Sequence, residues 1–238
     1  MGQSATIYTL MLRSVTGRGR LIALGGLAAV AVGLAIVLRI AETTTPADER
    51  AVELINALGL SIVVPIGALV VASATLGQLR EDDTLVYVWL RPVGRGRIVA
   101  LAWAAAFTVT LGLVALPLVV AALAAGGGAG VALATGVAAA LGLAAYCAVF
   151  TVLGMRLRNA LLWGLLYILL WEGVLAALGR GVNNLALRNY TRSLLSNISD
   201  ESLRLADASS GTAAIVLLAV CGVAIGLGRW LLNRMDVE

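Results

Sequence analysis

Long apolar runs separated by short polar stretches dominate the pattern of this chain. Six runs could cross a bilayer as helices, because a hydrocarbon core of about 30 Å needs roughly 20 mostly apolar residues. They lie at about 21–40, 54–76, 98–122, 130–154, 160–178 and 211–231. Each run is continuous, whereas the strands of a membrane barrel alternate between apolar and polar positions. The pattern predicts an all-α membrane protein of six transmembrane helices, forming one transmembrane domain over residues 1–238.

The segment before the first run has an amphipathic pattern. Within residues 3–16, Ile7, Leu10, Met11 and Val15 fall near one face of a helix. A helix of this kind, lying in the membrane interface, is the interpretation we favour. A flexible tail is the alternative.

A second amphipathic region separates the last two runs. Between Gly179 and Ser210, leucines, a tyrosine and an isoleucine are scattered among arginines and acids. Two short helices with a break near Ser199–Asp200 would account for this pattern. We therefore expect an outer helical or re-entrant segment between spans 5 and 6.

Composition supports a membrane location and removes several kinds of chemistry. Sixty-one per cent of residues are hydrophobic and 13% are charged, which leaves too little polar surface for a soluble domain of this length. The chain contains no histidine, so it cannot build a Ser-His pair, a histidine-ligated metal site or a histidine proton relay. Cys147 and Cys221 lie inside predicted spans without CxxC spacing, and we interpret them as small buried apolar side chains.

The basic residues suggest an orientation and an origin. All 17 of them are arginines, and the missing lysine is typical of a GC-rich bacterial genome. If the N-terminus is inside, 11 arginines fall on the inner segments and six on the outer ones. Arginine excess on short loops marks the cytoplasmic side. We expect a multi-pass protein of the bacterial cytoplasmic membrane with both termini in the cytoplasm.

The inner loop between spans 2 and 3 carries an unusual concentration of charge. Three acids precede a threonine that could cap a helix, an apolar stretch comes next, and a proline and arginines end it. Negative charge at a helix start is favourable because the backbone N–H groups there lack partners. The pattern predicts a short cytoplasmic coupling helix that transmits a push from a soluble partner. An interfacial helix that only anchors the loop is the alternative. The residues concerned are Glu81, Asp82, Asp83, Thr84, Leu85, Arg91, Pro92 and Arg95.

This loop resembles the inner loop of permease subunits of bacterial type-2 ABC exporters. The family pattern is an acid-rich stretch, often Glu-x-x-Gly-Thr-Leu, then apolar residues and Arg-Pro-Val-x-Arg. Asp83 stands where glycine is frequent, and Trp103 lies in the neighbourhood where a lysine is often found. The stretch 167–173, reading YILLWEG, is similar to a Trp-Glu pair in many bacterial members. The layout of entry helix, six spans and outer segment extends the resemblance over nearly the full length.

The resemblance implies that the chain works together with other subunits. Such a permease pairs with a second permease chain, identical or a sister, and two copies of an ABC ATPase subunit dock on the inner loops. ATP and Mg would be bound by that ATPase, since this chain has no GxxxxGK[ST] loop and is not expected to be an enzyme or to bind a cofactor itself. The pair would move a substrate outward. An autonomous ion-coupled carrier or channel without an ATPase is the alternative.

Glu172 is the only carboxylate well inside a predicted span. It lies about 18 Å along the helix from Ala160, at roughly 1.5 Å per residue. A carboxylate at that depth is costly unless it is paired, protonated or facing water, and Arg180 is one candidate partner. Two interpretations stay open. Glu172 fixes the outer segment by a hydrogen bond, or it lines the outer end of the translocation path with Trp171 and Tyr167.

Overall fold

The computed structural model of the chain describes residues 2–41, 45–81, 94–174, 183–201, 203 and 208–234, and every regular element in these ranges is helical. Five helical stretches are long and apolar enough to cross a membrane, which indicates a multi-pass membrane protein. They are Arg18–Ile40, Ala47–Gly77, Gly96–Ala124, Ala129–Arg156 and Ser210–Arg234.

These five stretches coincide with five of the six expected spans. The region of the fifth expected span, 160–178, contains a shorter apolar helix, Ala160–Gly173. Residues 175–182 lie outside the described ranges, so a crossing at this point stays a prediction.

In chain order, the elements are α1 (Gly2–Val15), α2 (Arg18–Ile40), α3 (Ala47–Leu54), η1 (Ile55–Val63), α4 (Val64–Glu81), α6 (Arg95–Thr110), η2 (Leu111–Ala115), α7 (Leu116–Ala124), α8 (Ala129–Arg156), α9 (Ala160–Leu166), η3 (Tyr167–Val174), α11 (Leu187–Ser199) and α12 (Ser210–Arg234).

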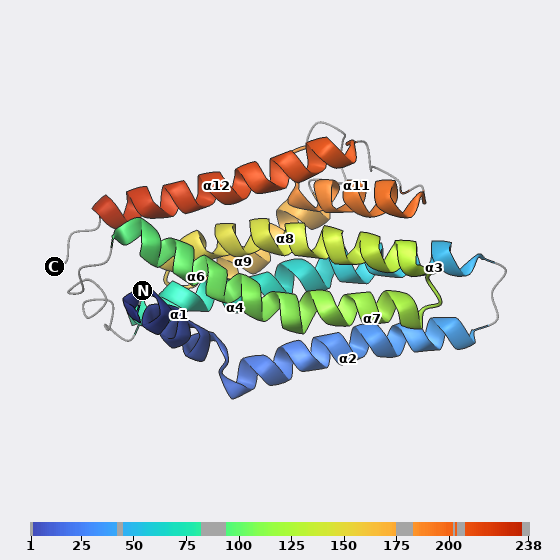
Figure 1. The fold of residues 1–238 in the computed structure, drawn as a ribbon, viewed down its shortest axis with the longest axis horizontal. Coiled ribbons are helices and arrows are strands. Elements are labelled where there is room, and N and C mark those ends of the chain that lie inside the picture. The colour runs from blue at the N-terminus through green and yellow to red at the C-terminus, as the bar shows by residue number, and fades with distance from the viewer. Residues whose placement is uncertain are drawn as a thin grey trace.

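The long helices run side by side along one axis, with α8 in the middle of the bundle (Figure 1). α8 packs on α4, α11 and α12, while α2 packs on α7 at the other side. One end of the bundle carries α1 and the C-terminal end of α12 and is called the α1 end. The opposite end carries α3 and the α7–α8 connection and is called the α3 end.

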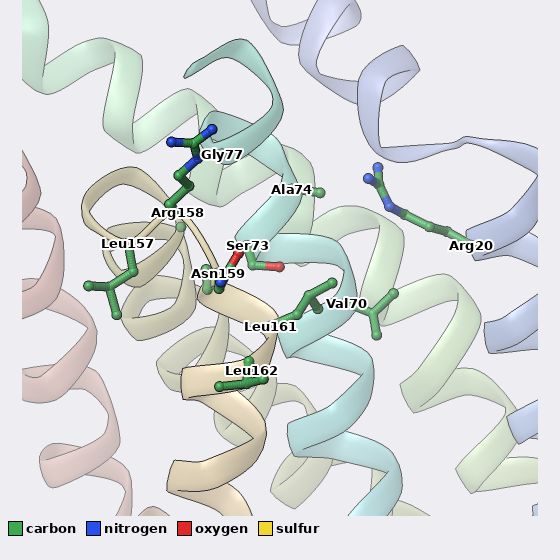
Figure 2. Close-up of a pocket in the computed structure, with 12 residues that line it drawn as sticks. Arg20, Val70, Ser73, Ala74, Gly77, Leu157, Arg158, Asn159, Leu161 and Leu162 are labelled. Atoms are coloured by element: carbon green, nitrogen blue, oxygen red, sulfur yellow. The ribbon is translucent and has the colours of Figure 1, made fainter. Parts of the chain in front are cut away.

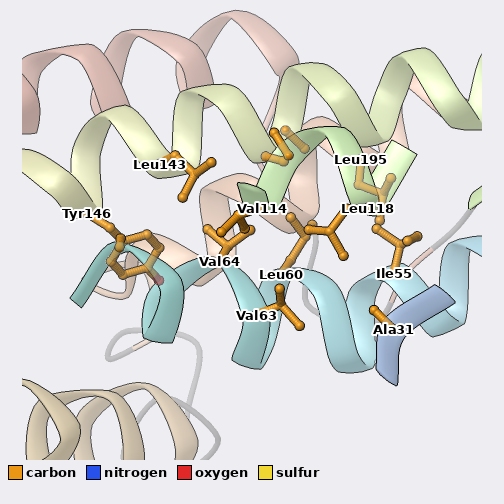
Figure 3. Packing of buried hydrophobic residues seen from close by; sticks show 14 of the residues in the cluster. Ala31, Ile55, Leu60, Val63, Val64, Val114, Leu118, Leu143, Tyr146 and Leu195 are labelled. Carbon is orange, nitrogen blue, oxygen red and sulfur yellow. The ribbon is translucent and has the colours of Figure 1, made fainter. Parts of the chain in front are cut away.

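The core consists of aliphatic side chains in the middle of the bundle. Leu60, Val64, Leu118 and Leu143 are all less than 2% exposed, and Figure 3 shows them meeting between α4, η1, α7 and α8. Tyr146 lies in this layer too, beside the aliphatic residues and wholly buried. Its position matters because a phenol hydroxyl inside such a core needs a hydrogen-bond partner.

Helices α4 and α8 come into close backbone contact near the α1 end. A Cβ added to Gly154 would lie 2.3 Å from the carbonyl oxygen of Ser73, closer than any side chain tolerates. A glycine at this position therefore lets the two backbones touch, as small residues do where membrane helices cross.

Helix α1 forms over the range that the sequence predicts, and it packs on the bundle. Met11 and Val15 are buried, and the Tyr8 hydroxyl donates to Thr108 Oγ1 of α6 at 2.9 Å. Leu10, which the sequence placed on the same apolar face, is 52% exposed. The difference arises because the spacing of four residues between Met11 and Val15 fixes the buried face, and Leu10 is rotated away from it. The interfacial position of α1 stays a prediction.

Three segments of the described helices are π-helical rather than α-helical. η1, η2 and η3 each continue a neighbouring α-helix, so a long helix changes its winding without ending. π-helical turns are rare and are frequently found at functional sites. Two of them, η1 and η3, contribute to the polar contacts around Glu172 and α11.

Candidate functional site around Glu172

Glu172 lies on η3, is 1% exposed and accepts hydrogen bonds from two tyrosines. The Tyr146 hydroxyl on α8 donates to Glu172 Oε2 at 2.5 Å, and the Tyr167 hydroxyl donates to Oε1 at 3.2 Å. Phe150 packs against both phenol rings, stacked on Tyr146 and edge-on to Tyr167. Both carboxylate oxygens are thus satisfied in an otherwise apolar setting.

The π-helical winding of η3 creates one of these bonds. Tyr167 and Glu172 are five residues apart, a spacing that would put them on different faces of an α-helix. In a π-helix the backbone bonds run between residues i and i+5, so such residues lie above one another. The chain thereby brings a hydroxyl donor from its own helix to the carboxylate.

The carboxylate also meets the first turn of α11. Leu187 and Arg188, the first two residues of that helix, lie near enough to the Glu172 carboxyl group to interact with it. Asn189 comes next, 1% exposed, and its amide nitrogen donates to Asn184 Oδ1 at 3.3 Å. Unpaired N–H groups and the helix dipole make a helix N-terminus attractive to an anion. The buried carboxyl group of Glu172 therefore lies beside the N-terminus of α11, although it comes from a different helix.

A second polar contact holds the middle of α11. Arg192 Nε donates to Asn56 Oδ1 of η1 at 2.8 Å. Thr191, the neighbouring residue, is wholly buried and faces Gly142 near the middle of α8. The first half of α11 is therefore packed deep in the bundle, beside the centre of a membrane-length helix.

The end of α11 agrees with the break expected near Ser199–Asp200. The helix stops at Ser199, and Asp200 adopts a left-handed conformation with φ of 58°. A short polar side chain is among the few that adopt this conformation. The second expected helix falls on a stretch in which residues 202 and 204–207 lie outside the described ranges.

Of the three residues proposed for the path or the outer segment, the structure brings two together. Glu172 and Tyr167 are bonded, whereas Trp171 is half-buried on η3. Arg180, the partner suggested by the sequence, lies outside the described residues. Sequence reasoning missed Tyr146, which is 26 residues from Glu172 inside another span. A lone tyrosine in the middle of an apolar run was the available signal, because its hydroxyl needs a partner.

The inner loop is only partly covered by the structure. Glu81 is the last residue of α4 and Arg95 the first of α6, so the flanking helices end and begin at the α1 end. The other proposed coupling residues fall within 82–93, which lies outside the described ranges: Asp82, Asp83, Thr84, Leu85, Arg91 and Pro92.

A cavity of about 590 Å³ opens near the α1 end, between α2, α4 and α9. Figure 2 shows Arg20 on one side of it and Arg158 on the other, with Val70, Ser73 and Ala74 of α4 between them. Its remaining wall consists largely of residues 157–162 at the start of α9. The cavity is thus mostly apolar with two cations at its rim.

No protein-family model matches this chain, and no curated protein sequence matches it.

Proposed function

We propose that this chain is the membrane-spanning permease subunit of an ATP-driven ABC exporter of the bacterial cytoplasmic membrane. It moves a substrate outward when a separate ABC ATPase subunit, which binds ATP and Mg, docks on the loop between α4 and α6. The loop sequence around Glu81, Thr84 and Pro92 supports this assignment through its resemblance to type-2 exporter permeases.

The structural observation that supports it best is the packing around that loop. α4 and α6, which flank the loop, share a buried cluster with α1, α8 and α12 at the α1 end. Its buried members are Met11, Leu76, Ile98, Val99, Ala102, Ala105, Met155 and Leu232. A force applied to the loop therefore reaches several helices at once, because a close-packed cluster transmits displacement.

The arrangement of α11 agrees with the same proposal. An amphipathic helix between α9–η3 and α12, with a buried carboxyl group beside its N-terminus, fits the outer or re-entrant segment of such a permease. The alternative, an ion-coupled carrier, would use intramembrane charges or an internal repeat to couple an ion. A single intramembrane acid, Glu172, held by two tyrosine hydroxyls, offers little support for that alternative.

The second permease chain is part of the proposal. Apolar side chains on the α9–η3 surface are largely exposed, among them Leu161, Leu162, Trp163 and Leu169. Lipid or a paired chain, the same or a sister, would cover them. Cross-linking in native membranes that yields a permease pair together with the ATPase is the expected result.

The first test is a mild-detergent purification of the tagged chain from its native cells, followed by mass spectrometry. A P-loop ATPase in stoichiometric amount is expected. Transport catalysed by the purified chain alone in liposomes would contradict the proposal and favour the carrier or channel.

Charge reversal in the loop tests the coupling role directly. Glu81→Arg with Asp82→Arg should lower ATPase co-purification and permease-stimulated ATP hydrolysis at least fivefold, since the loop acids would face the partner. The matched control is Glu49→Arg with Glu53→Arg in α3, which should leave both unchanged. If the two double variants show the same ATPase co-purification and ATP hydrolysis, the loop acids face solvent and do not contact the ATPase.

A further inference from the structure

We propose that the cavity between α2, α4 and α9 is a binding site for an anionic phospholipid of the leaflet at the α1 end. In the expected orientation this is the cytoplasmic leaflet. The inference concerns binding by the chain itself and does not depend on the exporter proposal. The cavity, of about 590 Å³, lies within the range of roughly 300–1,000 Å³ that is usual for small-molecule sites.

The two arginines at the rim define the charge of the ligand. Arg20 lies in the first turn of α2 and Arg158 in the connection between α8 and α9, so they approach from separate elements (Figure 2). Arg20 also donates Nη1–H to the carbonyl of Ser14 at 3.0 Å, which ties this side chain to the end of α1. Guanidinium groups bind phosphate through paired N–H donors, and basic pockets between membrane helices bind lipid headgroups.

The walls define the rest of the ligand. Val70 and Ala74 of α4 and Leu161 and Leu162 of α9 line the cavity below the arginines. Leu161 and Leu162 are 55% and 62% exposed, so the apolar wall continues from the cavity onto the outside of the bundle. An acyl chain could run along this wall while its phosphate stays at the rim.

Position along the bundle favours a lipid over a soluble anion. Arg20 lies at the start of α2 and Arg158 just after the end of α8, the level at which lipid headgroups are found. α4 lines the cavity from Val70 to Gly77, and Gly77 is the last residue of that membrane-length helical stretch. A free phosphate would satisfy the arginines and leave the apolar walls uncovered. A lipid satisfies both, because each part of it meets a surface of its own kind.

Native mass spectrometry of the full chain in detergent tests the site. Phosphatidylglycerol is the probe, and phosphatidylcholine with the same acyl chains is the comparison. We expect one phosphatidylglycerol per chain, held at least tenfold more tightly than phosphatidylcholine. Equal affinity for the two lipids would overturn the proposal, as would displacement of phosphatidylglycerol by millimolar inorganic phosphate, which would indicate a soluble-anion site.

Variants locate the binding within the chain. Arg158→Gln should weaken phosphatidylglycerol binding about fivefold, and Arg20→Gln with Arg158→Gln roughly thirtyfold, the scale expected for basic residues near an anionic headgroup. Arg18→Gln, an exposed arginine two residues before Arg20 and outside the cavity lining, should change it less than twofold. If Arg158→Gln and Arg18→Gln weaken phosphatidylglycerol binding equally, the lipid responds only to general surface charge, and the proposed site is wrong.

A third variant tests the apolar wall of the cavity separately from the two arginines, and the unfolding midpoint of each variant detects misfolding. Ala74→Leu adds bulk to the cavity wall and keeps both arginines, and it should weaken binding at least fivefold. Arg158 is exposed in a connection, so its replacement should leave the unfolding midpoint in detergent unchanged. Retained binding in Ala74→Leu at an unchanged midpoint would show that the lipid lies elsewhere. A change in dimer content in place of lipid binding would identify the cavity as a subunit contact and overturn the lipid assignment.

Discussion

At the scale of single residues, the bond between Tyr146 and Glu172 is the polar contact whose loss should cost most. Tyr146→Phe removes one donor from a buried carboxylate and leaves the shape of the core unchanged. We expect the free energy of unfolding to fall by about 1.5–3 kcal/mol, the usual contribution of a hydrogen bond to a charged group. Denaturant titration in mixed micelles measures it.

Tyr8→Phe provides the matched control for that substitution. It removes a phenol hydroxyl whose bond to Thr108 is exposed, and it should cost less than about 0.5 kcal/mol. If both substitutions lower the free energy of unfolding by the same small amount, the hydrogen bond from Tyr146 to Glu172 does not stabilise the bundle.

A second residue-scale prediction concerns the crossing of α4 and α8. Gly154→Ala places a methyl group against the backbone of Ser73, so the helices must separate. Overpacking of this kind costs about 1–3 kcal/mol. Thermal unfolding in detergent is the measurement.

The control for this crossing is Gly222→Ala on α12. A Cβ there meets nothing within 4 Å inside the chain, and alanine is the better helix former. The thermal-unfolding midpoint of the Gly222→Ala protein should be unchanged or higher. A Gly154→Ala protein as stable as the Gly222→Ala protein would mean that the two helices do not touch at Gly154.

At the scale of elements, α11 depends on groups outside itself for its position. Glu172→Gln replaces the carboxyl group beside its N-terminus by an amide, so the first turn of α11 should open more easily. We expect the backbone amides near Leu187 and Arg188 to exchange hydrogen about tenfold faster, which corresponds to roughly 1.4 kcal/mol. Hydrogen–deuterium exchange read by mass spectrometry reports this, with α12 as the internal reference.

Glu53→Gln is the control for the exchange experiment. It removes an exposed acid of α3 at the same end of the bundle and should leave α11 protection unchanged. Uniform loss of protection across α8, α11 and α12 in Glu172→Gln would point to a global loss of stability and contradict a specific effect at the N-terminus of α11.

The elements differ in how far the sequence predicts them, because their signals differ physically. Continuous apolar runs of bilayer length are unambiguous, and five of the six expected spans coincide with described helices. The break at Asp200 was readable because polar residues interrupt the helical period. The contact between Tyr146 and Glu172 was not readable, since it joins two helices far apart in the chain. The π-helical turns were also missed, because a change of one residue in winding leaves an all-apolar pattern unchanged.

At the scale of the whole molecule, arginine distribution predicts that the α1 end lies in the cytoplasm. Cysteines introduced at exposed Thr45, just before α3, and at exposed Arg158, just after α8, would lie at the α3 end and the α1 end respectively. We expect the Thr45→Cys protein to react with a membrane-impermeant maleimide in intact cells, and the Arg158→Cys protein to react only after lysis. Background from Cys147 and Cys221 should be low because both thiols are buried.

The reverse labelling pattern would place the α1 end outside. It would also remove the proposed docking loop from the side on which ATP is available, so this topology measurement bears on the exporter proposal as well. The lipid site would then belong to the opposite leaflet.

The π-helical winding of η3 makes the phase of this helix sensitive to chain length. Deleting one apolar residue, such as Leu169 or Leu170, would place Tyr167 and Glu172 four residues apart, the spacing at which residues of an ordinary α-helix share a face. The deletion would therefore allow α-helical winding while Glu172 stays on the side of Tyr167. Inserting one residue would instead require a second widened turn, or it would rotate Glu172 by about 100° away from Tyr146 and α11. A one-residue deletion and a one-residue insertion in this stretch should therefore have unequal effects, although both leave hydropathy almost unchanged.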